Sequence, residues 1–137
     1  MGTERVLDDF AGRWTIVRDI THADGTRGRF DGAARFEPRG DGLDYIEEGV
    51  LRIGQGAPLS AAQRYRWEAD LSVYFEDGRF FHHVPPAGGD TAHWCAPDQY
   101  DGSYDFAHWP AFEVIWRVRG PRKDYRMRSR YVRSASA

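Results

Sequence analysis

The chain has 137 residues, enough for one domain, and its 41% hydrophobic and 15% aromatic residues predict a packed core rather than disorder. The formal net charge is −2, and the lack of any run of about 18 apolar residues excludes a transmembrane helix. A single cysteine, Cys95, excludes an intrachain disulfide, and the N-terminal MGTERVLDDF lacks the apolar run of a secretory signal. We therefore expect one cytoplasmic domain over residues 1–137.

The predicted elements begin with a short helix and continue as strands. Val6, Leu7 and Phe10 have helical spacing, so we expect a short N-terminal helix over residues 3–11 that ends at Gly12. From Arg13 onward, runs rich in Val, Ile, Phe, Tyr and Trp alternate with turn sequences such as ADGTRG, PRGDG, GQGAP, EDGR and GPRKD. This pattern predicts an all-β fold, an antiparallel up-and-down meander of about ten strands that forms a β-barrel.

The first three predicted strands bring two opposite charges to the inner face. A turn at PRGD sets Gly32 opposite Glu47, and the preceding hairpin sets Arg18 opposite Gly32. Arg18 and Glu47 are then two strands apart, about 10 Å between backbones, across a residue with no side chain. Arg18 is a candidate for holding a ligand carboxylate or phosphate, and Glu47 a candidate general base. The alternative is a buried ion pair with a structural role.

The two-residue turn Asp77-Gly78 places a histidine inside the predicted barrel. It sets Phe75 opposite Phe80 and Val73 opposite His82, so that His82 points inward and the next residue, His83, points outward. A neutral His82 is a candidate for proton transfer or for ligating a metal or haem. The alternative is a core histidine that is only hydrogen-bonded.

His93 and Cys95 form a second candidate pair. They are two residues apart and share a face of their strand, but the irregular turns around them leave that face unassigned. A His-x-Cys pair with no second cysteine or nearby carboxylate is a weak metal signal, so we expect no metal site.

The last two predicted hairpins carry eight basic residues and one acidic residue over 117–137. Their registers place Asp101 opposite Arg117 and Asp124 opposite Arg119. Pairing across strands accounts for most of this charge, so we expect no nucleic-acid partner.

Hydroxyl groups lie among aromatic rings on the predicted inner face. A small barrel filled only for stability would favour Leu, Ile and Val, so this lining predicts a ligand cavity with placed donors. The alternatives are that the tyrosine hydroxyls point to the barrel ends, and that Gly102, opposite Trp116, makes room only for the indole. The inner-face candidates are Trp67, Tyr100, Tyr104, Trp116, Tyr125 and Ser129.

Gly12-Arg13-Trp14, at the start of the first strand, resembles the Gly-x-Trp motif of lipocalins and their calycin relatives. The resemblance implies a lipocalin-like barrel in which Arg130 or Arg133 from the last strand packs on Trp14. The chain looks more like intracellular ten-stranded barrels, the fatty-acid-binding proteins and nitrobindin-type haem proteins, than like a secreted carrier.

A second resemblance extends over nearly the whole chain. The runs GRW, EEG, FEDGRFFH, HWC, DQYDG and WRVRGPRKDY resemble an uncharacterised bacterial and fungal family of short barrels, known only as a domain of unknown function. This resemblance implies the fold and carries no activity.

Three functions are therefore predicted. The first is binding of a small amphipathic or aromatic molecule by Arg18, Glu47, His82, His93 and the inner-face candidates, with no bound cofactor. The second is an enzyme that transfers protons through Glu47 or His82, and the third is haem binding through His82 or His93. Besides the small molecule we expect no membrane partner, and a monomer or homodimer.

Overall fold

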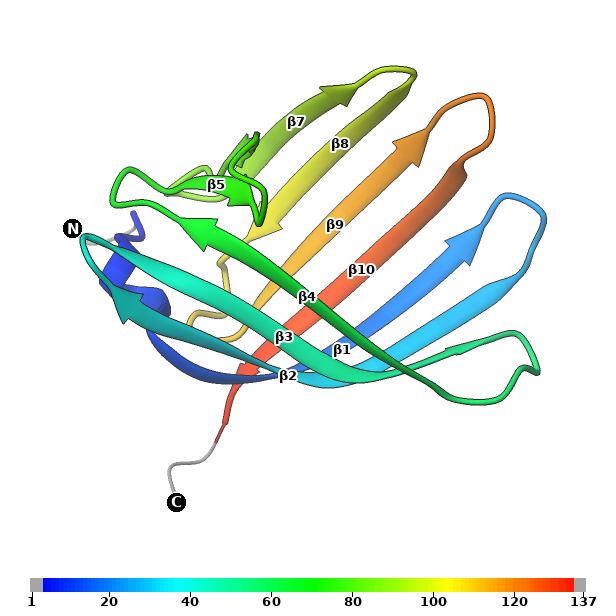
Figure 1. Ribbon diagram of the computed structural model, residues 1–137, viewed down its shortest axis with the longest axis horizontal. Coiled ribbons are helices and arrows are strands. Elements are labelled where there is room, and N and C mark those ends of the chain that lie inside the picture. The colour runs from blue at the N-terminus through cyan, green and yellow to red at the C-terminus, as the bar shows by residue number, and fades with distance from the viewer. Residues whose placement is uncertain (1–3, 135–137) are drawn as a thin grey trace.

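The computed structural model describes residues 4–134 and contains ten antiparallel strands in one sheet (Figure 1). The order across the sheet is β6-β5-β4-β3-β2-β1-β10-β9-β8-β7. Strands consecutive in sequence are therefore neighbours in the sheet except for β6 and β7, which are its two edges, and the first and last strands pair. This confirms the predicted meander, as a nearly closed barrel. The strands are β1 (Gly12–His22), β2 (Arg27–Arg39), β3 (Gly42–Ile53), β4 (Leu59–Trp67), β5 (Ser72–Phe75), β6 (Phe80–His83), β7 (Gly89–Cys95), β8 (Asp98–Asp105), β9 (Phe112–Arg119) and β10 (Asp124–Arg133).

The predicted N-terminal helix is a single 3-10 turn, η1 (Leu7–Phe10). Its prediction over residues 3–11 was too long, and Thr3 lies outside the described residues. Leu7 and Phe10 are buried, so the turn closes one end of the barrel with its apolar side chains. None of the helices within residues 4–134 is long and apolar enough to cross a membrane.

The closed end of the barrel is held by contacts that link the η1 segment with β1 and β10. The indole Nε1 of Trp14 donates a hydrogen bond to the carbonyl of Phe10, at 2.9 Å. The guanidinium carbon of Arg133 lies 4.1 Å from the Trp14 ring centroid, and Arg133 also donates to the carbonyls of Asp9 and Ala11. The arginine predicted to pack on the tryptophan is therefore Arg133.

The predicted registers of the C-terminal hairpins are confirmed. Gly102 pairs with Trp116, and Trp116 pairs with Met127. On the outer face Arg117 bonds Asp124, and Arg119 bonds Asp101. The basic charge of this segment is thus largely neutralised by acidic neighbours, as predicted, although the two arginines exchange partners.

The N-terminal registers differ from the prediction by two residues. Gly32 pairs with Ile16 and Gly49, rather than with Arg18 and Glu47. For β2 and β3 the reason is the position of the turn: Arg39 pairs with Gly42, so the chain reverses at residues 40–41, where Gly40 has a φ of 59°. A shift by two residues leaves each side chain on its predicted face of the sheet.

The hairpin of β5 and β6 also differs from the prediction. A bulge between Val73 and Tyr74 pairs Tyr74 with Phe80, while Val73 still pairs with His82. Phe80 is therefore exposed, and Phe81 takes the inward position that was predicted for Phe80. His82 is buried and His83 is exposed, as predicted.

Candidate functional site

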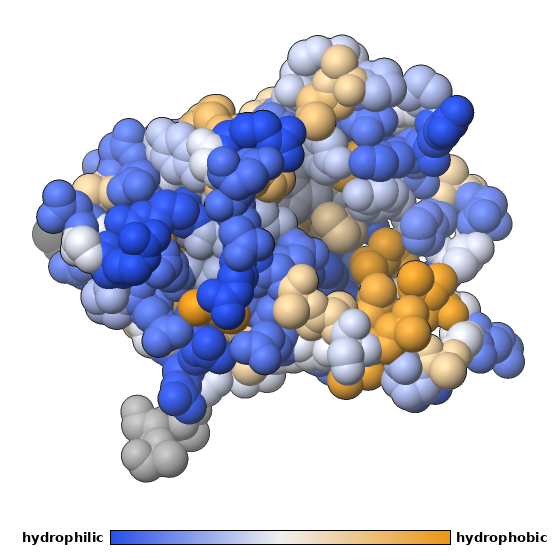
Figure 2. Space-filling model, viewed as in Figure 1, coloured by the Kyte–Doolittle hydropathy of each residue, from blue (hydrophilic) through white to orange (hydrophobic). Residues whose placement is uncertain are grey.

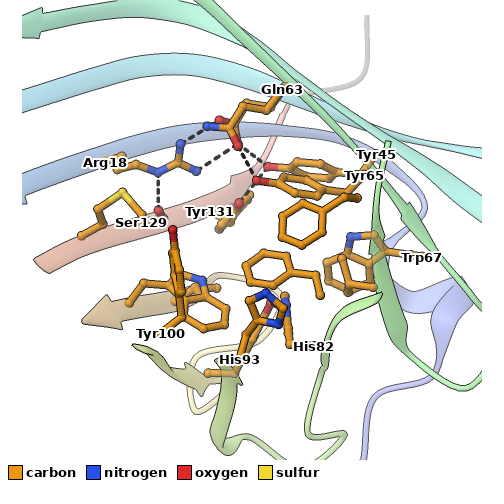
Figure 3. Close-up of a pocket in the computed structure, with 18 of the residues that line it drawn as sticks. Arg18, Tyr45, Gln63, Tyr65, Trp67, His82, His93, Tyr100, Ser129 and Tyr131 are labelled. Atoms are coloured by element: carbon orange, nitrogen blue, oxygen red, sulfur yellow. Dashed lines mark hydrogen bonds and ion pairs between the residues drawn. The ribbon is translucent and has the colours of Figure 1, made fainter. Parts of the chain in front are cut away.

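A cavity of about 300 Å³ lies inside the barrel (Figure 3). All ten residues predicted to contact a ligand line it: Arg18, Glu47, Trp67, His82, His93, Tyr100, Tyr104, Trp116, Tyr125 and Ser129. Cys95 lines it as well. His93 and Cys95 therefore point inward, an orientation that the sequence alone left open.

A bidentate ion pair forms the polar side of the cavity. Arg18 Nη1 donates to Glu47 Oε2 at 2.7 Å, and Nη2 donates to Oε1 at 2.9 Å. The side chains are 12% and 3% exposed. Burial by itself would lower the pKa of Arg18, but the hydrogen bonds to Glu47 and the nearby negative charge raise it above its usual range. Arg18 is therefore always charged, and Glu47 neutralises it.

Aromatic and hydroxyl groups complete the hydrogen bonds of this pair. Arg18 Nε donates to Ser129 Oγ at 2.6 Å, and the Tyr45 hydroxyl donates to Glu47 Oε1 at 2.6 Å. The Tyr45 and Tyr131 hydroxyls are 2.8 Å apart, and because Tyr45 donates to Glu47, Tyr131 donates to Tyr45. Burial raises the pKa of Tyr131 to about 12 and that of Tyr45 well above its usual range. Both hydroxyls therefore stay protonated at neutral pH.

The glycine expected between Arg18 and Glu47 has another role. A Cβ on Gly32 would lie 2.6 Å from the ring of Phe30, so the missing side chain makes room for that ring. The guanidinium of Arg18 lies 5.2 Å from the same ring centroid. The Arg18 guanidinium therefore lies over the Phe30 ring while its nitrogens donate hydrogen bonds to Glu47.

His82 is held neutral on the opposite side of the cavity. Its Nε2 is 2.8 Å from the Tyr104 hydroxyl, and only 3% of the residue is exposed. Burial, followed by the proximity of His93 and His83, lowers the pKa of His82 to about 3. His82 Nδ1 and His93 Nε2 are buried with no hydrogen-bond partner in the described part of the chain.

Rings form the rest of the wall. Phe81 stacks on Trp116 at 5.1 Å between centroids and on Phe75 at 4.6 Å. A Cβ on Gly102 would come within 2.7 Å of the Trp116 ring, so this glycine accommodates the indole, which was one of its two predicted roles.

Several lining residues were not among the predicted site residues: Tyr45, Gln63, Tyr65, Phe75 and Phe81. Alternation along β3 and β4 could have identified Tyr45, Gln63 and Tyr65, because they share a face with Glu47 and Trp67. Phe81 could not be found in this way, since the bulge reverses the alternation there. Tyr65 donates to Gln63 Oε1, which leaves the amide nitrogen of Gln63 free of partners among residues 4–134.

The arrangement favours binding over acid–base chemistry. Both oxygens of Glu47 already accept hydrogen bonds from Arg18, and Oε1 accepts a further one from Tyr45. By contrast, the hydroxyl hydrogen of Ser129 has no acceptor within the described residues, and Ser129 lines the cavity. Residues 4–134 contain no group of three or more His, Cys, Asp or Glu side chains that could hold a metal ion.

Comparison with known proteins supports the fold. The model of a family described as "Family of unknown function (DUF6314)" matches residues 10–133. No curated protein matches the chain. Among solved structures, the S-type phycobiliprotein lyase CPES from Guillardia theta superposes with a TM-score of 0.68 at 7% sequence identity, covering 96% of this chain and 92% of that chain. At this identity the likeness shows a shared lipocalin-like barrel fold.

Proposed function

The chain belongs to the DUF6314 family of unknown function, and from that premise we propose that it binds a small, largely aromatic and uncharged molecule inside the barrel. The observation that carries this proposal is the cavity of about 300 Å³, which has stacked rings on one side and a satisfied polar cluster on the other. Ligand pockets of proteins span roughly 300–1,000 Å³, so the cavity suits a small ligand of one to three rings.

The charge of the cavity argues for an uncharged ligand. Glu47 neutralises Arg18, and His82 is neutral because burial lowers its pKa to about 3. A charged ligand would lose its hydration without meeting an unpaired opposite charge, which is costly in a buried site. An acceptor oxygen on the ligand would instead receive the free hydroxyl hydrogen of Ser129, next to Arg18. The expected ligand is thus amphipathic, with one polar edge.

The phycobiliprotein lyase supports this proposal through its fold alone, because 7% identity transfers no residue roles. Proton transfer by Glu47 or His82 has less support, since the carboxylate is saturated with hydrogen bonds. Haem binding has less support as well. His82 Nε2 is already held by the Tyr104 hydroxyl, so it is not free to bind haem iron.

A series of three probes with one ring system tests the ligand class. 2-Naphthol, 2-naphthoate and 2-naphthylmethylammonium are neutral, anionic and cationic at pH 7 and share the naphthalene ring, and Trp67 and Trp116 in the cavity wall report binding by fluorescence quenching. We expect 2-naphthol to bind most tightly. Tightest binding of either charged probe would contradict the uncharged class.

A matched pair of variants tests the location. Val114 is 6% exposed and lines the cavity, whereas Ile115 points to the outer face of the same strand. Val114→Phe should fill the cavity and weaken 2-naphthol binding at least tenfold, and Ile115→Phe should leave the affinity unchanged. Equal affinity of both variants, or no binding of any probe to the folded protein, would overturn the proposal.

A further inference from the structure

The inner face of the sheet continues as an exposed apolar surface at the end of the barrel opposite η1. Beyond Arg18, the inward positions of β1, β3 and β4 are Ile20, Leu51, Ile53 and Leu59, which we call the apolar lip. Leu51 pairs with Leu59, and Ile53 and Ile20 both pair with Gly28. Ile53 is 43% exposed and Leu59 is 56% exposed. Figure 2 shows hydrophobic residues gathered over this end of β3 and β4.

Unneutralised arginines surround the apolar lip. Arg27, Arg52, Arg122 and Arg126 lie at or beside the strand ends of the same side and are exposed. In the described part of the chain none of these four forms an ion pair, and Arg27 and Arg126 flank the same residue, Thr21. We call these four residues the basic rim.

The basic rim is not a general property of this end of the barrel. Arg29 pairs with Asp31, Arg117 with Asp124 and Arg128 with Glu113. The acidic partners of these three arginines are therefore already used within the fold, while Asp24 in the turn between β1 and β2 accepts a hydrogen bond from the Thr26 amide and forms no ion pair with the described residues. Within residues 4–134, the four unpaired arginines of the rim therefore leave an excess of positive charge at this end.

We propose that the open end of the barrel docks on an anionic phospholipid surface. Exposed apolar side chains next to uncompensated arginines are the combination that binds interfaces with anionic headgroups. A second copy of the chain fits less well, because its basic rim would face an identical rim. This inference departs from the expectation that no membrane is involved, and it stands whether or not the cavity holds a ligand.

Vesicle co-sedimentation with the full chain tests the proposal. The protein should bind vesicles of phosphatidylcholine containing one-third phosphatidylglycerol, bind vesicles of phosphatidylcholine alone much less, and lose binding as salt rises. Each arginine near such a surface contributes roughly a fivefold change in partitioning, so Arg27→Gln, Arg52→Gln and Arg126→Gln together should reduce it about a hundredfold.

The contribution of the apolar lip has a matched control. Val132 is 55% exposed, as Leu59 is 56% exposed, but it lies on the outer face near the closed end. Leu59→Asp should weaken binding to anionic vesicles on the order of tenfold, and Val132→Asp should have no effect. Thermal unfolding of each variant checks that the barrel is intact, and Ile53→Ser provides a second lip variant.

Three outcomes would overturn the proposal. These are no retention of the wild type on anionic vesicles, equal losses for Leu59→Asp and Val132→Asp, and binding that is insensitive to the arginine substitutions. Retention of the arginine dependence without any effect of Leu59→Asp or Ile53→Ser would indicate an acidic protein surface as the partner instead. The naphthol measurements are independent of all these results.

Discussion

The Arg18–Glu47 pair places two full charges inside the barrel, where their desolvation must be offset by direct contact. The offset comes from the two hydrogen bonds between them and from further bonds to Ser129 and Tyr45. A buried pair of this kind contributes little net stability, but the loss of one partner leaves the other charge buried without a counter-ion. The pair therefore fixes the polar side of the cavity more than it stabilises the fold.

Replacing one partner of this pair should lower the stability of the protein, and replacing both partners with apolar residues should recover most of it. Glu47→Gln should lower the free energy of unfolding by about 3–5 kcal/mol, because Arg18 keeps a buried charge without its counter-ion. The double variant Arg18→Met with Glu47→Leu should recover most of the loss. Urea unfolding measures both.

The exposed pair of Arg29 and Asp31 is the control, since both side chains are more than half exposed. Asp31→Asn should change stability by less than about 1 kcal/mol. A similar cost for Asp31→Asn and Glu47→Gln would refute a special role for the buried pair.

The neutral state of His82 predicts a pH dependence of stability. Its pKa is about 3 in the folded chain and about 6.5 when unfolded, so between these values the unfolded chain binds a proton that the folded chain does not. The contribution of His82 is complete above pH 6.5 and is lost as pH falls toward 3, with a slope of at most about 1.4 kcal/mol per pH unit. Several aspartates with lowered pKa values act in the same direction, among them Asp44.

Comparing the pH dependence of stability between variants separates the contribution of His82 from that of the other titrating groups. His82→Gln should show a shallower decline of unfolding free energy between pH 6 and pH 4 than the wild type, and the exposed neighbour His83→Gln should retain the wild-type slope. Parallel curves for all three proteins would show that His82 is accessible to protons when folded.

At the scale of elements, the bulge in the β5–β6 hairpin decides which phenylalanine builds the cavity. Phe81 is 9% exposed and stacks on both Phe75 and Trp116, whereas Phe80 is 50% exposed. Phe81→Ala should therefore destabilise the protein by about 3–5 kcal/mol and enlarge the cavity. Phe80→Ala should cost less than about 1 kcal/mol in the same denaturant titration. A larger cost for Phe80→Ala than for Phe81→Ala would instead support the predicted register without a bulge.

At the scale of the whole molecule, the sheet has two edges because β6 and β7 do not pair in a ladder. β7 pairs with β8 alone, while β1 pairs on both sides with β2 and β10. Amides of β7 that point away from β8 should exchange with solvent deuterium far faster than those of β1. Uniform protection of β7, measured by NMR hydrogen exchange at low protein concentration, would mean that the barrel closes fully.

The sequence by itself determined the strand meander, the face of each candidate residue and therefore the composition of the cavity wall. These features depend on the two-residue alternation of a strand, which is local and survives a register shift of two residues. Arg18 and Glu47 met for this reason, although their predicted cross-strand neighbours were wrong.

Only the tertiary structure decided the features that depend on where turns and bulges fall. The reversal at residues 40–41, the exchange of Phe80 for Phe81 and the choice of Arg133 over Arg130 at Trp14 are among them. So is the apolar lip, because alternation predicts that Ile53 and Leu59 face inward, and only the structure shows that they are exposed at the barrel end. Such features arise from competition among many distant contacts, which no local pattern records.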